Sequence, residues 1–275
     1  MASTAVRPTS LPPWTYRSLI WVFAQRDLKA RFKGTVGGWM WSLLLPLATV
    51  VIYSVVFSLV IRVQPPPFGN GSKGVYFVWL LVGLVPWNFF SSTVLMGMPS
   101  LLSSGGLLQK VYFPSYIPII SMAIAVGVQS LIELGIVAAI LLFFGSVGWS
   151  WLLVPVWLVI FVLFTVSVSY VFAVANVHTR DVAQILGVIM QLVFFMTPII
   201  FPITMIPVDF HGIPARAIVA ANPLAAFLID LRSLVYELRV PDVTEWGYLL
   251  LWTAGVLLVA MWVYRKWGQD IGESV

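Results

Sequence analysis

The stretch Arg26-Asp27-Leu28-Lys29-Ala30-Arg31-Phe32-Lys33-Gly34 directly precedes the first long apolar segment of the chain, which begins near Trp39. Four of its nine residues are basic and one is acidic. Lys and Arg residues beside a membrane span are retained on the cytoplasmic side. This cluster therefore predicts that the chain first enters a membrane from the cytoplasm, and the placement of every later segment follows from it.

The residues up to Lys33 also carry a helical pattern. On a period of about 3.6 residues, an apolar row faces away from a basic row. The apolar row holds Trp21, Ala24, Leu28 and Phe32, and the basic row holds Arg26, Lys29 and Lys33. We expect an amphipathic helix over residues 14–33 that lies in the membrane surface, with its basic side toward anionic headgroups.

The composition is that of an all-α integral membrane protein. Of the 275 residues, 60% are hydrophobic and 9% are charged, against roughly 25% charged in soluble domains. The long uninterrupted apolar runs favour helices over the short alternating segments of a β-barrel. The net charge of +5 is divided among loops, so no nucleic-acid surface is expected. The absence of cysteine excludes disulfides and thiolate metal sites.

Six apolar segments are long enough to be transmembrane helices. They cover residues 39–61, 75–96, 117–144, 149–175, 182–201 and 246–264, each near the ~20 residues that cross ~30 Å of hydrocarbon. We expect a single membrane domain over residues 1–275, with the six-span bundle at 39–264. The expected cytoplasmic segments hold ten of the 15 Lys and Arg residues, which places both termini in the cytoplasm.

The segment between the fifth and sixth spans is too long for a turn and too apolar for a solvated loop. Its stretches 215–221 and 224–236 are helix-like, and neither is long enough to cross a bilayer. We expect two short re-entrant helices over residues 214–237, with their backbone buried in protein or lining a wet cavity.

The expected cytoplasmic segment from Pro99 to Pro118 is amphipathic and predicted to expose apolar side chains. This set is Leu107, Leu108, Val111, Tyr112 and Phe113, with Lys110 among them. Exposed apolar side chains at such a surface indicate a partner. The other cytoplasmic loop, residues 176–181, is compact and polar.

The sequence has no nucleotide-binding or catalytic motif. The stretch Gly69-Asn70-Gly71-Ser72-Lys73-Gly74 lacks the G-x-x-x-x-G-K-[ST] spacing of a phosphate-binding loop. No H-E-x-x-H or G-x-S-x-G string occurs, and the chain has two histidines. We therefore expect no enzyme activity and no cofactor bound by this chain.

Glu133 is the one carboxylate expected in the middle of a span, and Gln129 lies on the same helical face. An ionisable group at that depth is expected to face the protein interior or water. Two roles remain open. Glu133 is either part of a proton relay or a cargo contact, or it is a hydrogen-bonded packing residue.

Aromatic side chains of the first and fifth expected spans suit a carbohydrate path, because flat rings stack on sugar faces. This set is Tyr53, Phe57, Phe194 and Phe201. Other aromatic residues fit the interfacial positions at which Trp and Tyr anchor membrane helices, and anchoring is also the alternative for the first set. The expected anchors are Trp79, Trp87, Trp149, Trp151, Trp246 and Trp262.

The basic residues before the first span are Arg26, Lys29, Arg31 and Lys33. Their charge and donors suit a lipid diphosphate, and ordinary headgroup contact explains them equally well. Near the end of the fifth span, Pro198 is expected to act as a kink or hinge, and the later Pro202 and Pro207 as plain helix stops.

Five short strings, in order along nearly the whole chain, resemble the membrane subunits of ABC-2 type exporters of polysaccharides. That family includes O-antigen, teichoic acid and capsule permeases. The strings are the stretch from Arg26 to Gly34 with Gly38-x-x-Trp41 and Pro46, Leu108-x-Lys110-Val111-x-Phe113-Pro114, Arg180-Asp181-Val182, Thr197-Pro198-Ile199 and Asn222-Pro223-Leu224. The sequence departs from the family at Ser115-Tyr116, where an arginine and an acid usually follow the Phe-Pro.

The resemblance implies a permease that works as a homodimer with two copies of a separate ATP-binding subunit, which would bind the ATP and Mg. It implies that Leu107 to Phe113 form a coupling helix against that subunit, beside Arg180 and Asp181. It also implies that the first and fifth spans line the channel. The implied cargo is a polyprenyl-diphosphate-linked polysaccharide, exported through a bacterial inner membrane.

Two other functions remain as alternatives. One is a membrane-embedded transferase that acts on lipid-linked sugars, for which the chain offers few catalytic acids or bases. The other is a secondary carrier, which would couple ion movement through Glu133.

Overall fold

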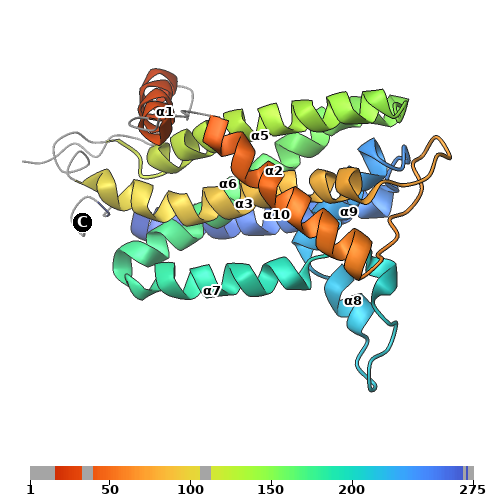
Figure 1. Cartoon of the computed structure of the whole chain (residues 1–275). Coiled ribbons are helices and arrows are strands. Elements are labelled where there is room, and N and C mark those ends of the chain that lie inside the picture. The colour runs from red at the N-terminus through yellow and green to blue at the C-terminus, as the bar shows by residue number, and fades with distance from the viewer. Residues whose placement is uncertain (1–15, 33–39, 106–112, 269–270, 272–275) are drawn as a thin grey trace, which may run out of the picture.

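The computed structural model describes residues 16–32, 40–105, 113–268 and 271, which form a helical bundle (Figure 1). The one β feature of these residues is an isolated bridge between Phe210 and Ile213. The α-helices are α1 (Arg17–Phe32), α2 (Met40–Ser54), α3 (Tyr76–Ser103), α5 (Ile117–Phe143), α6 (Val154–His178), α7 (Asp181–Met196), α8 (Ala215–Ala220), α9 (Pro223–Val235) and α10 (Val243–Val263). Shorter π- or 3₁₀-helical pieces are η2 (Val55–Val60), η3 (Trp149–Leu153), η4 (Ile203–Met205) and η5 (Tyr264–Gly268).

Helix α3 is the most enclosed element, because its sequence is apolar around the whole circumference. Of its 28 residues, 19 are buried, whereas α10 buries four of its 21 residues. Helix α6 approaches α3 closely at Gly97, where an added Cβ would lie 2.2 Å from Oγ of Ser169. The Ser169 hydroxyl donates to the carbonyl of Thr93 at 2.9 Å, so the crossing is held by a buried hydrogen bond.

Among the described residues, four helical segments are long and apolar enough to cross a membrane. They are Tyr76–Ser103, Ile117–Phe143, Trp149–His178 and Val243–Gly268, which correspond to the second, third, fourth and sixth expected spans. The first and fifth expected spans correspond to shorter apolar helices, Pro46–Val60 and Asp181–Met196. The chain is therefore an all-helical, multi-pass membrane protein, and the count of six crossings stays a prediction.

Helix α7 ends at Met196, before the expected limit of the fifth span at Phe201. The expectation of a helix up to Phe201 is wrong, because Pro198 has no N–H to donate and disfavours a helical conformation at the residue before it. That residue, Thr197, has extended backbone angles of φ −105° and ψ 136°. Pro198 therefore follows the end of the helix and is not the expected kink or hinge within it.

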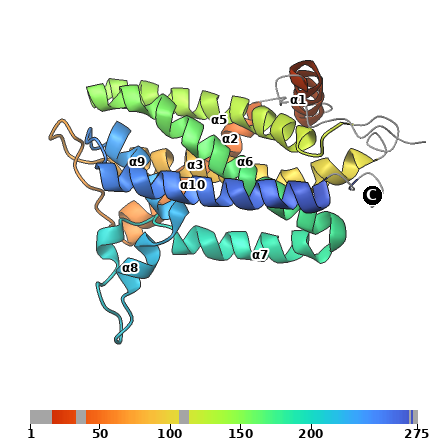
Figure 2. The same ribbon diagram turned by 180° about the vertical axis from the view of Figure 1, so that it is seen from behind.

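The connecting segments gather at two opposite ends of the bundle. One end holds α1, the connection between α6 and α7, and the C-terminal end of the chain (Figure 1). The other end holds α8, α9 and the segment between η2 and α3, as the reverse view also shows (Figure 2). The segments expected to be cytoplasmic therefore lie together, away from those expected outside.

The segment between α7 and α10 contains two short helices, as the sequence predicts. Helix α9 is embedded in the bundle, with Phe227, Leu228 and Leu234 fully buried. The indole N–H of Trp157 donates to the carbonyl of Phe227 at 3.1 Å. The backbone of α9 is thus enclosed by protein, which is what a re-entrant helix requires. Its depth in a membrane stays a prediction.

Helix α1 lies across the start of α5, where Oγ of Ser121 donates to the carbonyl of Ile20 at 3.1 Å. The packed face is displaced from the expected apolar row, because Trp21 is 54% exposed. The side chains that face α5 and the cluster around it are Ile20, Phe23, Ala24 and Asp27. Arg26 and Lys29 remain exposed, as expected for a basic row.

Replacing Gly97 by Val should destabilise the fold, because the new side chain would collide with Ser169 where α3 and α6 cross. Overpacking of this kind costs about 1–3 kcal/mol. Gly135→Val is the matched control, since nothing lies within 4 Å of a Cβ added to Gly135. Thermal unfolding in detergent should give a lower Tm for Gly97→Val than for Gly135→Val. Equal Tm values would contradict a tight crossing at this point.

Candidate functional site

A row of aromatic rings connects α2 and η2 with α3 and α7. The ring of Tyr53 lies 6.2 Å from the ring of Phe194 and 6.2 Å from that of Phe57. Phe194 continues the row to Trp87 at 5.4 Å, and Phe57 stacks on Tyr76 at 6.3 Å. Three of the four residues expected to line a path are therefore brought together by the first and fifth apolar segments.

Three of these rings, those of Tyr53, Trp87 and Phe194, border a groove of about 820 Å³ between α2, α3 and α7, whereas Phe57 and Tyr76 do not line it. The aromatic part of its lining is Tyr53, Trp87, Phe194 and Phe195, and the hydrogen-bonding part is Thr49, Asn88, Ser91 and Gln191. The described lining contains no charged side chain. Flat rings interleaved with neutral amides and hydroxyls suit a hydroxyl-rich ligand better than an ionic one.

Three groove residues on α3 were not found by sequence reasoning. Trp87 was expected to be an interfacial anchor, but it is 7% exposed because it lies against Phe194 inside the bundle. The same correction applies to Trp79, which is 2% exposed. Asn88 and Ser91 are three residues apart on one face of a mainly apolar helix, and this polar pair was the available signal.

Phe201, the fourth expected path residue, lies beyond the end of α7. It packs against the main core, and none of the ring contacts between described residues joins it to Tyr53, Phe57 or Phe194. The structure therefore separates Phe201 from the aromatic row because the backbone turns at Pro198.

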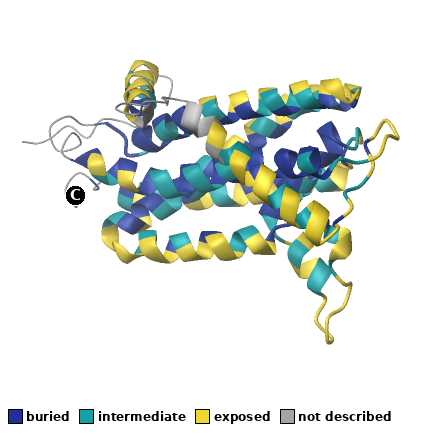
Figure 3. Cartoon of the chain, in the orientation of Figure 1, coloured by how far each residue is buried: buried dark blue, intermediate teal, exposed yellow. Residues whose placement is uncertain are grey.

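The two helices that flank the groove expose apolar side chains on their outer faces (Figure 3). On α2 and η2 the exposed residues include Val51, Ile52, Val55 and Leu59. On α7 they include Ile185, Val188, Leu192 and Met196. Helix α7 buries only Leu186 and Met190 among its 16 residues. An apolar surface of this extent is a contact surface for lipid or for another protein.

Glu133 faces the protein interior, as expected, and is 6% exposed. Its Oε1 accepts a hydrogen bond from Nε2 of Gln129 at 2.9 Å, which confirms that the two share a helical face. A small cavity of about 20 Å³ beside Glu133 shares Leu84 and Asn88 with the groove. Glu133 does not line the groove itself, so this geometry favours the packing role over a contact with cargo.

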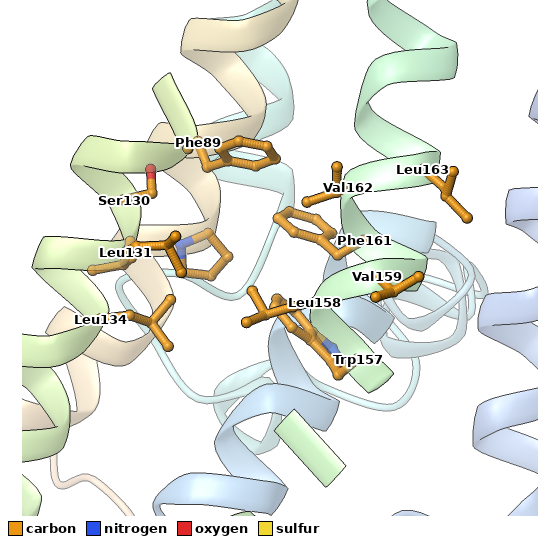
Figure 4. Close-up of a pocket in the computed structure, with 13 residues that line it drawn as sticks. Phe89, Ser130, Leu131, Leu134, Trp157, Leu158, Val159, Phe161, Val162 and Leu163 are labelled. Carbon is orange, nitrogen blue, oxygen red and sulfur yellow. The ribbon is translucent and has the colours of Figure 1, made fainter. Parts of the chain in front are cut away.

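A second cavity, of about 330 Å³, lies between α5 and α6 and is apolar (Figure 4). Trp157 and Phe161 from α6 and Phe89 from α3 project into it, opposite Leu131 and Leu134 of α5 (Figure 4). Its one hydroxyl is that of Ser130. The absence of further hydrogen-bonding groups among its lining residues makes it unsuitable for a polar ligand, in contrast to the groove.

At the end of the bundle that holds α1, Phe113 is buried. Its ring lies 5.5 Å from the ring of Phe23, and the residue is 5% exposed. The expectation that Phe113 is exposed is wrong, because α1 covers it. The remaining expected coupling residues, Leu107, Leu108, Lys110 and Val111, lie outside the described residues.

Ser115, at the departure from the family pattern, makes hydrogen bonds within the chain. Its Oγ donates to the carbonyl of Gly268 at 2.8 Å and lies 3.0 Å from the hydroxyl of Tyr170. Since the single serine proton is used on Gly268, Tyr170 is the donor of the second bond. A neutral contact with α6 and η5 thus occupies the place of a charged residue.

The connection between α6 and α7 leaves Arg180 and Asp181 exposed. The side-chain oxygen of Asn176 accepts a hydrogen bond from the backbone N–H of Ala183 at 3.1 Å. This bond satisfies one of the free N–H groups in the first turn of α7.

The basic row is only partly described. Arg26 forms an ion pair with Asp27 at 2.9 Å, and Asp27 lies on the face of α1 that is buried. Lys29 is exposed. The side chain of Arg31 and all of Lys33 lie outside the described residues. Within the described residues no group of three or more His, Cys, Asp or Glu side chains has the arrangement of a metal site.

Comparison with known proteins agrees with this architecture. The chain is 28% identical to the O-antigen export system permease protein RfbA of Myxococcus xanthus, over 95% of this chain and 97% of that protein. It is 31% identical to an RfbA of Klebsiella pneumoniae, over 78% and 79% of the two chains. It is 22% identical to the polysialic acid transport protein KpsM of Escherichia coli, over 87% and 90%.

A family model matches residues 18–236, which run from α1 to the end of α9 and include every residue of the groove. This match covers most of the chain. The protein belongs to the ABC-2 type transporter family.

Proposed function

We propose that this chain is the membrane permease subunit of an ATP-driven exporter that moves a lipid-linked polysaccharide out of the cytoplasm. The observation that carries the proposal is the uncharged groove between α2, α3 and α7. A sugar chain presents apolar ring faces and hydroxyl edges, which match the rings and amides of the lining. The names of the relatives, which refer to O-antigen and polysialic acid, support this class of cargo.

A homodimer would turn the groove into a channel. Gln191 and Phe195 are exposed at its open side, between the apolar faces of α2 and α7. Hydrocarbon is a poor cover for Gln191 and Asn88, because it leaves their hydrogen bonds unmade. Two copies that face each other across α2 and α7 would bury both apolar faces and enclose the polar lining.

The energy would come from two copies of a separate ATP-binding subunit, which would hold the ATP and Mg. The lack of a phosphate-binding loop in the sequence supports this division. Residues 107–112 would contact that subunit together with Arg180 and Asp181. Arg180 and Asp181 are exposed at the end of the bundle where α3 runs out and α5 begins (Figure 1).

The cargo would enter past α1. The exposed Arg26 and Lys29, with Arg31 and Lys33 after them in sequence, would contact the diphosphate of a polyprenyl-linked glycan. In this arrangement α2 and α7 are the two shorter of six spans, and α8 with α9 forms a re-entrant segment on the outer side. The membrane would be the bacterial inner membrane, with both termini in the cytoplasm.

Removing groove rings should reduce export without abolishing ATP hydrolysis by the complex. Each aromatic contact contributes about 1 kcal/mol, so Tyr53→Ala and Phe194→Ala should each lower the export rate several-fold. Phe143→Ala is the matched control, because Phe143 is 87% exposed and far from the groove in sequence. Export of labelled glycan into vesicles measures the effect. Export reduced equally by all three changes would contradict a role for the groove.

The groove should be wet and the apolar cavity dry. The chain has no cysteine, so single cysteines can be introduced into the natural sequence. Ser91→Cys, in the groove, should react with a charged thiol reagent, whereas Ser130→Cys, in the apolar cavity, should not. Mass spectrometry of the labelled protein measures the reaction. Equal reactivity of the two cysteines would contradict the assignment of the path.

The isolated chain should hydrolyse no ATP, and Leu108→Asp should uncouple a co-expressed ATP-binding subunit from export. The reason is that a charge would be forced into an apolar contact with that subunit. Leu108→Met keeps the apolar surface and should retain export. Parallel assays of ATP hydrolysis and export test this. Normal export with Leu108→Asp would count against residues 107–112 as the coupling segment.

A further inference from the structure

The outer end of α7 is held far more firmly than its body. Along the helix only Leu186 and Met190 are buried. Immediately after it, Thr197 and Ile199 are fully buried and Ile200 is 3% exposed. The turn that follows α7 is therefore the point at which this otherwise exposed helix is fixed to the rest of the bundle.

The central contact of this turn is Arg232 of α9, which is 4% exposed. Its Nη1 donates to the carbonyl of Pro198, and its Nη2 donates to the carbonyl of Ile199 at 2.7 Å. The guanidinium carbon lies 3.5 Å from the centre of the Trp79 ring of α3. One side chain thus joins α9, α3 and the end of α7.

Helix α3 is shaped to receive this guanidinium group. A Cβ added to Gly83 would lie 2.2 Å from Nη2 of Arg232, so any larger residue would displace the side chain. Gly83 lies one helical turn from Trp79, which places the glycine and the ring on the same face of α3. Gly83 and Trp79 together form a socket for the guanidinium group of Arg232. The socket exists because Gly83 has no side chain.

Two further hydrogen bonds hold the same turn. Nδ2 of Asn222 donates to Oγ1 of Thr197 at 2.9 Å. The hydroxyl of Tyr76 donates to the carbonyl of Ile200 at 2.6 Å, and Tyr76 is also the end of the aromatic row that borders the groove. At the opposite end of α7 the described residues make one side-chain hydrogen bond, in which the backbone N–H of Ala183 donates to the side-chain oxygen of Asn176.

The charge of Arg232 is stabilised by dipoles. Among the described residues no carboxylate forms an ion pair with it. Its partners are the carbonyls of Pro198 and Ile199 in the turn that follows α7, and the face of an indole ring. A planar guanidinium can donate to two carbonyls and stack on a ring at once, which the ammonium group of lysine cannot do.

We propose that Arg232 is a positioning residue that fixes the outer end of α7 to α3 and α9 and so makes it the pivot of that helix. Movement of α7 that widens the groove would then occur at its inner part. This consequence for transport rests on the proposed function, whereas the fixing of the outer end is a property of the chain alone.

Distances between spin labels test the pivot in the purified full chain in nanodiscs, without cargo or ATP-binding subunit. Cysteines replace two exposed residues, Leu152 in η3 just before α6 and Met196 at the outer end of α7. The distance distribution between the labels should be narrow in the natural sequence. It should broaden in Arg232→Met, because the turn after α7 loses both carbonyl contacts and the ring contact. An unchanged width would overturn the proposal.

Arg216→Met is the matched control. Arg216 also donates to backbone carbonyls of the same outer segment, those of Thr204 and Ile206, and none of these hydrogen bonds reaches α3 or α7. Its removal should leave the outer distance narrow, and equal broadening by both changes would overturn a specific role for Arg232. A pair of labels at Ile185 and Leu258, nearer the inner end, should change less than the outer pair in Arg232→Met.

Arg232→Lys and Gly83→Ala keep the proposal testable if Arg232→Met does not fold. Both variants retain a cation at or near position 232. Neither variant allows this cation to bond the carbonyls of Pro198 and Ile199 and to stack on the ring of Trp79 at the same time. Each should broaden the outer distance, and the two changes together should broaden it no further than either alone, because they remove the same contact. Additive broadening would show that Gly83 and Arg232 act separately and would overturn the socket. Loss of ATP coupling would leave these results unaffected, so the two proposals fail independently.

Discussion

The enclosure of α3 is the constraint on which the rest of the structure depends. Inside a membrane a helix with an apolar circumference gains little by leaving lipid, so close packing and hydrogen bonds must hold it in place. Two glycines decide what can approach. Gly97 admits Ser169, which reaches the carbonyl of Thr93 at 2.9 Å, and Gly83 admits the guanidinium of Arg232. Helix α6 is thereby fixed to α3 at Gly97, and α9 is fixed to α3 at Gly83.

The side of α3 that faces α2 and α7 is different. There it carries Trp87, Asn88 and Ser91, and the two neighbouring helices leave a groove of about 820 Å³. Lipid chains would offer no hydrogen bond to the side-chain amide of Asn88. The polar lining of the groove therefore requires water or sugar as its neighbour. The exposed apolar faces of α2 and α7 require protein or lipid.

The sequence was sufficient to predict the features that composition and periodicity determine. It was not sufficient to predict the side-chain positions that tertiary contacts determine. The long apolar segments, the two short helices before α10 and the shared face of Gln129 and Glu133 follow from hydropathy and spacing. Trp87 and Phe113 could not be placed in this way. An aromatic residue has the same local sequence pattern whether its ring meets a headgroup or another ring, and only the approach of α7 to Trp87 and of α1 to Phe113 decides between them.

The groove is uncharged because the buried charged side chains near it lie outside its lining. Glu133 and Arg232 are both buried, and each has its own partners behind the lining: Gln129 for the carboxylate, backbone carbonyls and an indole for the guanidinium. The groove itself keeps only neutral rings, amides and hydroxyls. A path for a long polymer must bind each unit strongly enough to admit it and weakly enough to release it. Many small neutral contacts meet that condition, whereas a single exposed charge would hold one unit and stop the next.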